Sequence, residues 1–296
     1  MSDVELIPAT FTGFDEAGAV DLDAVERQAA ALAGSGVRRV FVNGTTGEFA
    51  SLSVDERVGL AQRWCEVAGD ELGVIVHVGD TSLADARHMA ARAEASGAKG
   101  IAAITPFFFQ PAGAGDLVEF AAQIAAAAPA TPFFHYYIPS MTGSRLRAVE
   151  VLERSIDRIP TLAGLKFTHE DLIEYAGCLA VAGDEREVLF GRDELLLSAL
   201  AEGARGAVGS CYALALPLFR RLGAAFSRGD LPACRAAQAQ ARMLIDTAVA
   251  LDPLPAFKHG MELLGVPCGP CRPPLTPLDE RARRALRAAL EAAGLL

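Results

Sequence analysis

Short apolar runs rich in β-branched and aromatic residues alternate with amphipathic segments along the first three quarters of the chain. The amphipathic segments include residues 22–36, 53–69 and 82–97, where apolar positions recur with helical spacing. Strands that are apolar on both faces and separated by helices indicate a parallel sheet covered by helices. Eight such units favour a closed (β/α)8 TIM barrel over an open sheet. The predicted strands are residues 5–11, 37–44, 73–79, 98–108, 132–139, 162–168, 187–191 and 205–210.

Residue pairs typical of helix starts precede several of the amphipathic segments. In a capping box, a hydroxyl residue and an acidic residue three positions later bond each other's backbone N–H groups. We expect capping boxes at three places: Ser53 with Glu56, Ser82 with Asp85, and Thr168 with Asp171.

The last part of the chain has a different pattern, in which no strand signal returns. Helical periodicity runs over residues 230–251, 255–265 and 278–294, and a proline-rich connection interrupts it. The pattern predicts a catalytic barrel domain over residues 1–225 and a C-terminal helical extension over residues 226–296.

Composition excludes several classes of partner. The 296-residue chain has a formal net charge of −10 and no basic cluster of more than a few residues, which argues against nucleic acid and against an anionic membrane surface. No apolar run approaches the roughly 18 residues of a membrane span, and the N-terminus lacks a secretory signal pattern. We therefore expect a soluble, cytoplasmic protein.

The motif Cys268-Gly-Pro-Cys271 lies in the proline-rich connection, where loop structure is expected in preference to redox or metal chemistry.

Active sites of TIM barrels collect at the C-terminal ends of the strands. The glycine-flanked pair Thr45-Thr46 follows the second strand, and its hydroxyls and backbone N–H groups could hold a carboxylate or phosphate. A simple turn with local threonine hydrogen bonds is the alternative. We expect Glu48, at the end of the same loop, to be structural and to accept hydrogen bonds from loop amides.

Lys166 lies on the sixth predicted strand and is one of only three lysines, against twenty-four arginines. Alternation along the strand puts Lys166 and Thr168 on one face and the bulky Leu165 and Phe167 on the other, so Lys166 should point into the barrel. Burial lowers a lysine pKa and yields a nucleophilic amine, which arginine cannot supply. A Schiff base with a carbonyl substrate is the natural chemistry, and a snorkelling or ion-paired lysine is the alternative.

Tyrosines on the fifth predicted strand could move the proton that such chemistry requires. Tyr136 and Tyr137 are adjacent and therefore face opposite sides of the strand. The alternative is core packing with the hydroxyl at an edge. None of the five histidines forms a recognisable triad or metal cluster, so we expect them to be structural.

Three motifs, GTTGE (44–48), YxIPxxTG (136–143) and GLKF (164–167), occur in that order on the second, fifth and sixth predicted strands. Together they resemble the dihydrodipicolinate synthase/N-acetylneuraminate lyase superfamily, and within it the animal-type N-acetylneuraminate lyase branch. The resemblance implies a (β/α)8 barrel with three additional C-terminal helices, a class I pyruvate aldolase, no metal or diffusible cofactor, and a homotetramer.

The resemblance also implies roles for individual residues. Lys166 would form the imine and Tyr136 would be the catalytic tyrosine. Thr45 and Thr46 would bind the substrate carboxylate. The polyhydroxy tail would be contacted by Thr168, Gly191, Asp193, Glu194 and Ser210.

Two departures from the superfamily pattern refine this expectation. Met141 stands where dihydrodipicolinate synthases usually have arginine, which argues against lysine biosynthesis. Residues 107–109 are all phenylalanine and lack the tyrosine that many relatives contribute to a proton relay across a subunit interface. The expected activity is the reversible cleavage of N-acetylneuraminate to pyruvate and N-acetylmannosamine. One alternative is a related aldolase or dehydratase acting on another 2-oxo sugar acid. The other is a 2-oxo acid binding or regulatory protein whose barrel has lost its aldolase activity.

Overall fold

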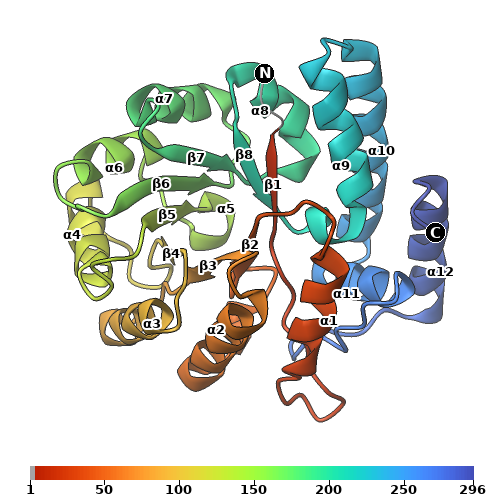
Figure 1. Ribbon diagram of the computed structural model, residues 1–296, viewed down its shortest axis with the longest axis horizontal. Helices are drawn as coiled ribbons and strands as arrows, with labels where there is room; N and C mark the ends of the chain where they lie inside the picture. The colour runs from red at the N-terminus through yellow and green to blue at the C-terminus, as the bar shows by residue number, and fades with distance from the viewer. Residues whose placement is uncertain (1–3) are drawn as a thin grey trace.

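The eight predicted strands form one parallel sheet that curls into a nearly closed barrel (Figure 1). A computed structural model describes residues 4–296. The strands are β1 (Glu5–Pro8), β2 (Arg39–Val42), β3 (Gly73–His77), β4 (Gly100–Ile104), β5 (Phe133–Tyr137), β6 (Leu162–Phe167), β7 (Glu187–Phe190) and β8 (Gly206–Gly209). Consecutive strands pair from β2 to β8, and β8 pairs with β1. A bridge between Ala9 and Phe41, in which the Thr10 N–H donates to the Phe41 carbonyl at 3.1 Å, joins β1 to β2. The predicted TIM barrel is confirmed.

Helices connect successive strands and form a ring around the barrel (Figure 1). The principal ones are α1 (Asp23–Leu32), α2 (Val54–Ala68), α3 (Leu83–Ala95), α4 (Ala114–Ala125), α6 (Ala148–Ser155), α7 (Leu172–Ala182), α8 (Leu196–Glu202) and α9 (Cys211–Ser227). Short helical turns follow three of the strands: η1 (Phe49–Ser51), α5 (Pro139–Thr142) and η2 (Asp193–Leu195).

The buried apolar side chains form two layers, as a barrel wall with two covered faces requires. The inner layer fills the barrel and includes Phe41, Tyr136 and Leu189. The outer layer lies between the strands and the helices and includes Leu165 and Phe167. Apolar residues on both faces of the strands therefore account for the continuous apolar runs in the sequence.

The helix starts agree only in part with the capping-box predictions. Ser53 and Glu56 form the reciprocal pair at the start of α2, as predicted. The Ser82 hydroxyl accepts the Asp85 N–H at the start of α3, but the Ser82 N–H donates to Asp80 instead of Asp85. Only half of the second box is present.

The third capping box, Thr168 with Asp171, is wrong. Helix α7 begins at Leu172, and its cap is Asp171, whose carboxylate accepts the Glu174 N–H at 3.0 Å. Four residues, 168–171, lie between the end of β6 and the first residue of α7, so Thr168 directly follows the strand and is too early in the chain to cap the helix.

Strand β6 contains a bulge. Phe133 of β5 is in register with Leu162, whereas the next residue, Phe134, is in register with Gly164, so Ala163 is extra. Gly164 has φ +152°, and a Cβ at this position would lie 1.9 Å from the Glu187 carbonyl oxygen of β7. Only glycine fits there, because the neighbouring strand backbone occupies the space of a side chain.

Three helices follow the barrel: α10 (Leu231–Ala250), α11 (Pro253–Leu263) and α12 (Glu280–Ala292). Helix α10 packs along α9 and also contacts α11 and α12 (Figure 1). The boundary between a barrel domain and an extension at residue 225, inside α9, stays a prediction. None of the helices within residues 4–296 is long and apolar enough to cross a membrane.

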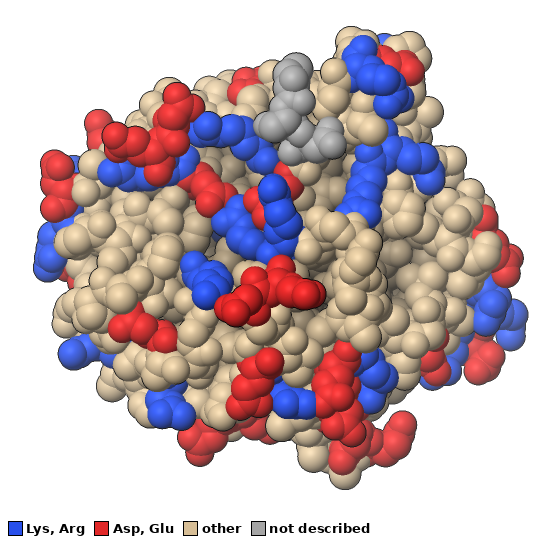
Figure 2. Space-filling view, viewed as in Figure 1, with Lys and Arg blue, Asp and Glu red and all other residues tan. Residues whose placement is uncertain are grey.

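Charges of both signs are interspersed on the face of the molecule shown in Figure 2, without a broad basic patch. Alternating signs do not attract a polyanion, because the fields of neighbouring opposite charges cancel over a Debye length.

Candidate active site

A cavity of about 350 Å³ lies at the C-terminal ends of the strands, where the loops after β2, β5, β6, β7 and β8 converge. All nine residues proposed from the sequence line it, although up to 165 positions separate them along the chain. They are Thr45, Thr46, Tyr136, Lys166, Thr168, Gly191, Asp193, Glu194 and Ser210.

Lys166 points into the barrel, as alternation along β6 predicts. Its Nζ lies 4.0 Å from the centre of the Phe41 ring and 4.0 Å from the centre of the Tyr136 ring. Burial lowers the pKa of Lys166 to about 7, and the nearby Asp193 carboxylate opposes part of that shift. A substantial fraction of the amine is therefore neutral, and nucleophilic, near neutral pH.

Tyr136 is the neighbour of Lys166 across the β5–β6 pairing, so both side chains point inward. Its hydroxyl lies 3.0 Å from the Thr45 Oγ1, within hydrogen-bond distance. Burial raises the pKa of Tyr136 to about 12, so the phenol is protonated and can pass a proton only by receiving another. Tyr137 faces the outer layer, where its hydroxyl donates to Glu174 at 3.3 Å.

The hydroxyl loop, residues 44–47, is held on both sides. Thr46 Oγ1 lies 2.6 Å from the Ser210 Oγ, which connects the loop after β2 to the end of β8. The Gly47 carbonyl accepts a hydrogen bond from Thr12 Oγ1 at 2.7 Å. A Cβ on Gly44 would lie 2.8 Å from the Phe41 ring, so glycine lets the loop pack on the aromatic floor beneath Lys166.

The contacts of Glu48 differ from those expected, which were hydrogen bonds from backbone amides of its own loop. Its carboxylate pairs with Lys258 Nζ at 2.7 Å and accepts the Arg272 backbone N–H at 3.0 Å. Both partners lie more than 200 residues away in sequence, and reasoning restricted to the loop could not identify them. Glu48 is a structural residue of this site, but it joins distant segments.

Asp193 is buried at the floor of the cavity near β8. One carboxylate oxygen accepts the Cys211 N–H at 2.9 Å, at the first turn of α9. Burial raises the pKa of Asp193 to about 6, and the hydrogen bond from Cys211 opposes that shift. A Cβ on Gly209 would lie 1.7 Å from the Asp193 Oδ1, so the carboxylate occupies space that only glycine leaves free. Glu194, next in the chain, pairs with Arg192 at 3.1 Å.

Thr168 and Gly191 lie together at the ends of β6 and β7. A Cβ on Gly191 would lie 2.1 Å from the Thr168 Oγ1, so glycine makes room for the hydroxyl. This oxygen is buried and has no hydrogen-bond partner among residues 4–296. The helix-cap alternative for Thr168 is excluded, since Asp171 caps α7, and Thr168 contributes to the lining of the cavity instead.

Several residues that line or support the cavity were missed by sequence reasoning. Phe41 lies under the lysine, Gly209 leaves space for Asp193, and part of the wall comes from α10, α11 and the segment after them. The C-terminal lining residues are Ile245, Val249, Asp252, Pro253, Leu254, Phe257 and Leu275. One signal pointed toward this region: Lys258 is another of the three lysines, and it lies in an apolar helical segment.

The two positions that depart from the superfamily pattern lie at the surface. Met141 lines the cavity rim and is 63% exposed. Phe108 and Phe109 are 76% and 84% exposed, whereas Phe107 packs against Phe49. Neither departure places a charged or hydroxyl group in the cavity.

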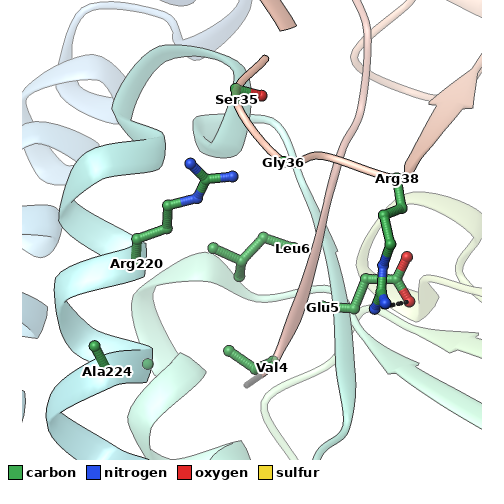
Figure 3. Close-up of a pocket in the computed structure, with 9 residues that line it drawn as sticks. Val4, Glu5, Leu6, Ser35, Gly36, Arg38, Arg220 and Ala224 are labelled. Atoms are coloured by element: carbon green, nitrogen blue, oxygen red, sulfur yellow. Dashed lines mark ion pairs between the residues drawn. The ribbon is translucent and has the colours of Figure 1, made fainter. Parts of the chain in front are cut away.

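A second cavity, of about 610 Å³, lies at the opposite end of the barrel beside the start of β1 (Figure 3). Arg220 extends from α9 toward Gly36, and Arg38 pairs with Glu5 at 3.7 Å. Its described lining holds no lysine, cysteine or histidine. The smaller cavity, with Lys166 and the strand ends, is therefore the candidate active site.

One group of side chains has the spacing of metal ligands. His169, Asp171 and Glu174 place one ligand atom each within 4.8 Å of the others, outside the lining of the candidate site. Arg147 lies 3.8 Å from Glu174, and Asp171 already caps α7. Because Arg147 already places a positive charge beside Glu174 and Asp171 already has a structural role, we assign no metal to this group.

Comparison with known proteins finds similar proteins that match nearly the whole chain. Residues 3–293 match the Dihydrodipicolinate synthetase family. The chain is 40% identical over 276 residues to the N-acetylneuraminate lyase of Mus musculus, covering 91% of this chain and 86% of that protein. Among solved structures, the N-acetylneuraminate lyase of Proteus mirabilis has a TM-score of 0.95 at 34% identity, covering 100% of both chains. The N-acetylneuraminate lyase (sialic acid aldolase) of Aliivibrio salmonicida has a TM-score of 0.95 at 38% identity, covering 100% of this chain and 99% of the other.

Proposed function

Because the chain belongs to the dihydrodipicolinate synthetase family, we propose that it catalyses the reversible cleavage of N-acetylneuraminate to pyruvate and N-acetylmannosamine. The observation that carries the proposal is Lys166, a buried amine with a pKa of about 7, beside Tyr136 and the two threonine hydroxyls in one cavity. The reaction is that of a carbon–carbon lyase working through a Schiff base.

The substrate carboxylate would bind at Thr45 and Thr46. Their hydroxyls and the backbone of the hydroxyl loop can donate hydrogen bonds to an anion, and glycines on both sides let the anion approach. This placement puts the C2 ketone of the open-chain sugar acid next to Lys166.

Lys166 then attacks C2, and water leaves as the protonated imine forms. Tyr136 accepts the proton of the C4 hydroxyl while it passes its own proton to Thr45 Oγ1, 3.0 Å away, and on to the carboxylate. The electrons of the O–H bond form the aldehyde, and those of the C3–C4 bond move into the imine to give an enamine. Protonation at C3 and hydrolysis of the imine release pyruvate. Because the imine withdraws charge as the bond breaks, it stabilises the transition state more than the ground state.

The polyhydroxy tail would lie against the ends of β6, β7 and β8. The free Thr168 hydroxyl and the Asp193 and Glu194 carboxylates offer acceptors for sugar hydroxyls. These roles are supported by the shared cavity and by the similarity to sialic acid aldolases. The cytoplasmic location and the homotetramer stay predictions.

The test is borohydride reduction of the protein in the presence of pyruvate, followed by peptide mass mapping. A reduced pyruvyl adduct on the Lys166 peptide is expected, and Lys166→Met, which buries no charge, should lose both the adduct and turnover while it stays folded. An adduct on Lys99 or Lys258 instead, or none at all, would refute the mechanism. Negligible cleavage of N-acetylneuraminate beside fast turnover of another 2-oxo sugar acid would favour a related aldolase.

A further inference from the structure

Glu48 and Lys258 form an ion pair that is almost completely removed from water. Their side chains are 1% and 2% exposed, and the charged atoms are 2.7 Å apart. Taking two charges out of water is costly, so such a pair persists where additional contacts compensate both ions. It also lies outside every role proposed so far for the chemistry.

Each ion has further partners in the proline-rich connection. Lys258 Nζ donates to the Pro270 carbonyl at 2.8 Å and lies 4.4 Å from the centre of the Phe14 ring. The Glu48 carboxylate accepts the Arg272 N–H at 3.0 Å. The pair therefore ties the loop after β2 to α11 and to residues 270–272.

On one side, the pair is continuous with the hydroxyl loop. Glu48 has a left-handed backbone, with φ +54°, and its N–H donates to the Thr45 carbonyl at 3.0 Å. A non-glycine residue in this conformation needs surrounding contacts to hold it there. Moving Glu48 therefore moves Thr45 and Thr46, whose hydroxyls lie 3.0 Å from Tyr136 and 2.6 Å from Ser210.

On the other side, the pair is continuous with the wall of the cavity that the C-terminal segment supplies. Lys258 lies on α11, and Pro253, Leu254 and Phe257 of the same helix line the cavity. One ion pair thus fixes the distance between the proposed carboxylate-binding loop and the wall opposite it.

We propose that Glu48 and Lys258 are positioning residues that hold the hydroxyl loop in the geometry needed to recognise the carboxylate of a 2-oxo acid. The inference rests on the proposed function, because it assigns the carboxylate to Thr45 and Thr46. Loss of Lys258 also lowers the affinity for the substrate carboxylate in a second way. It leaves the Glu48 carboxylate without its counterion, two residues from the bound anion, and the two negative charges repel each other.

The test compares two ketones that differ in the carboxylate only. Pyruvate and pyruvamide carry the same C2 carbonyl, so borohydride trapping at Lys166 over a range of concentrations gives a half-saturating concentration for each. In Lys258→Met and in Glu48→Gln, the preference for pyruvate over pyruvamide should fall by about tenfold or more, as expected when hydrogen bonding to a charged group is weakened. Half-saturation by pyruvamide should change much less.

Two further variants separate positioning from stability. The double variant Glu48→Gln with Lys258→Met leaves no unpaired buried charge, so it keeps the measurement possible if a single variant fails to fold. It should also show a reduced preference, because the link between loop and helix is gone. Glu187→Gln is the matched control: it breaks an ion pair with Arg39, 2.6 Å long, at the start of β7 and should leave the preference unchanged.

An unchanged preference in the single and double variants would overturn the inference, whatever happens to their stability. A preference that falls equally in Glu187→Gln would overturn it as well, since general destabilisation would then suffice. If the unaltered protein gives no adduct on Lys166 with pyruvate, the proposed function fails and the inference fails with it. An adduct with an unaltered preference removes the inference alone.

Discussion

Replacing Lys166 with methionine should stabilise the folded protein near neutral pH, although it removes the proposed nucleophile. Lys166 is 5% exposed, and its Nζ lies against the rings of Phe41 and Tyr136. Methionine has a similar length and shape, and it buries no group that can ionise. The substitution therefore removes the cost of keeping an ionisable amine in an apolar environment.

The size of the effect follows from the displacement of the pKa. Burial lowers the pKa of Lys166 from its ordinary value of 10.5 to about 7. In the unfolded chain the amine is fully protonated at pH 7. Folding must either release that proton or take the charged ammonium group out of water. With about 1.4 kcal/mol for each unit of pKa, the lysine lowers the free energy of unfolding by roughly 4 kcal/mol at pH 7.

The sign of the pH dependence is fixed by the same displacement. Between pH 7 and pH 10.5 the folded state binds fewer protons than the unfolded state, so the free energy of unfolding rises with pH across this window. At pH 10 the unfolded lysine is itself largely deprotonated, and the cost falls to roughly 1 kcal/mol. The advantage of methionine is therefore largest at or below pH 7 and mostly disappears by pH 10.

Urea unfolding of both proteins at pH 7 and pH 10 measures the difference directly. The two other lysines provide matched controls. Lys99→Met, at an exposed position, should leave stability unchanged, and Lys258→Met should lower it because Glu48 loses its ion-pair partner. If Lys166→Met is no more stable than the unaltered protein at pH 7, or if its advantage is as large at pH 10, the reasoning about burial is refuted.

Three other predictions concern the chemistry. The rate of pyruvate trapping at Lys166 should rise as the pH increases through about 7, because only the neutral amine attacks; a flat profile between pH 6 and pH 8 would contradict the lowered pKa. Tyr136→Phe should lower kcat for N-acetylneuraminate by roughly 10²- to 10⁴-fold while the pyruvate adduct still forms, and an equal loss of both would argue against a role in C–C cleavage. Gly209→Ala places a Cβ 1.7 Å from the Asp193 Oδ1, so the KM for N-acetylneuraminate should rise by about tenfold or more. Pyruvate trapping should persist in that variant, and an unchanged KM would exclude Asp193 from sugar binding.

The sequence predicted a parallel sheet covered by helices because its strands are apolar on both faces, and the number of strand–helix units favoured a closed barrel over an open sheet. It predicted the composition of the cavity because parallel strands bring their C-terminal ends to one end of the barrel, whatever their separation in sequence. Lys166 and Tyr136, on neighbouring strands, are an example: pairing in register makes both point inward.

Predictions failed where the deciding contact was distant or where two local patterns competed. Glu48 has partners more than 200 positions away, which no local pattern indicates. Thr168 and Asp171 each begin a plausible helix-capping sequence, and the path of the chain out of β6 selects the second. The space left by Gly209 for the Asp193 carboxylate is likewise visible only after β7 and β8 are side by side.

The bulge in β6 has a consequence for how the nucleophile is oriented. Leu162 and Leu165 both lie in the outer layer although three positions separate them, which strict alternation forbids. The extra residue resets the alternation, and Lys166 faces inward as a result. In a regular strand of the same length, Leu165 would face the barrel axis and Lys166 the helices.

The direction of the nucleophile is thus decided at Gly164, a residue without a side chain. A Cβ there would lie 1.9 Å from the Glu187 carbonyl oxygen, so any side chain displaces the strand that carries Lys166 from its place beside β7. Shortening β6 by Ala163, in contrast, would give a regular strand in which Lys166 still faces inward. A deletion at one position can therefore be milder for catalysis than a single added methyl group at the next.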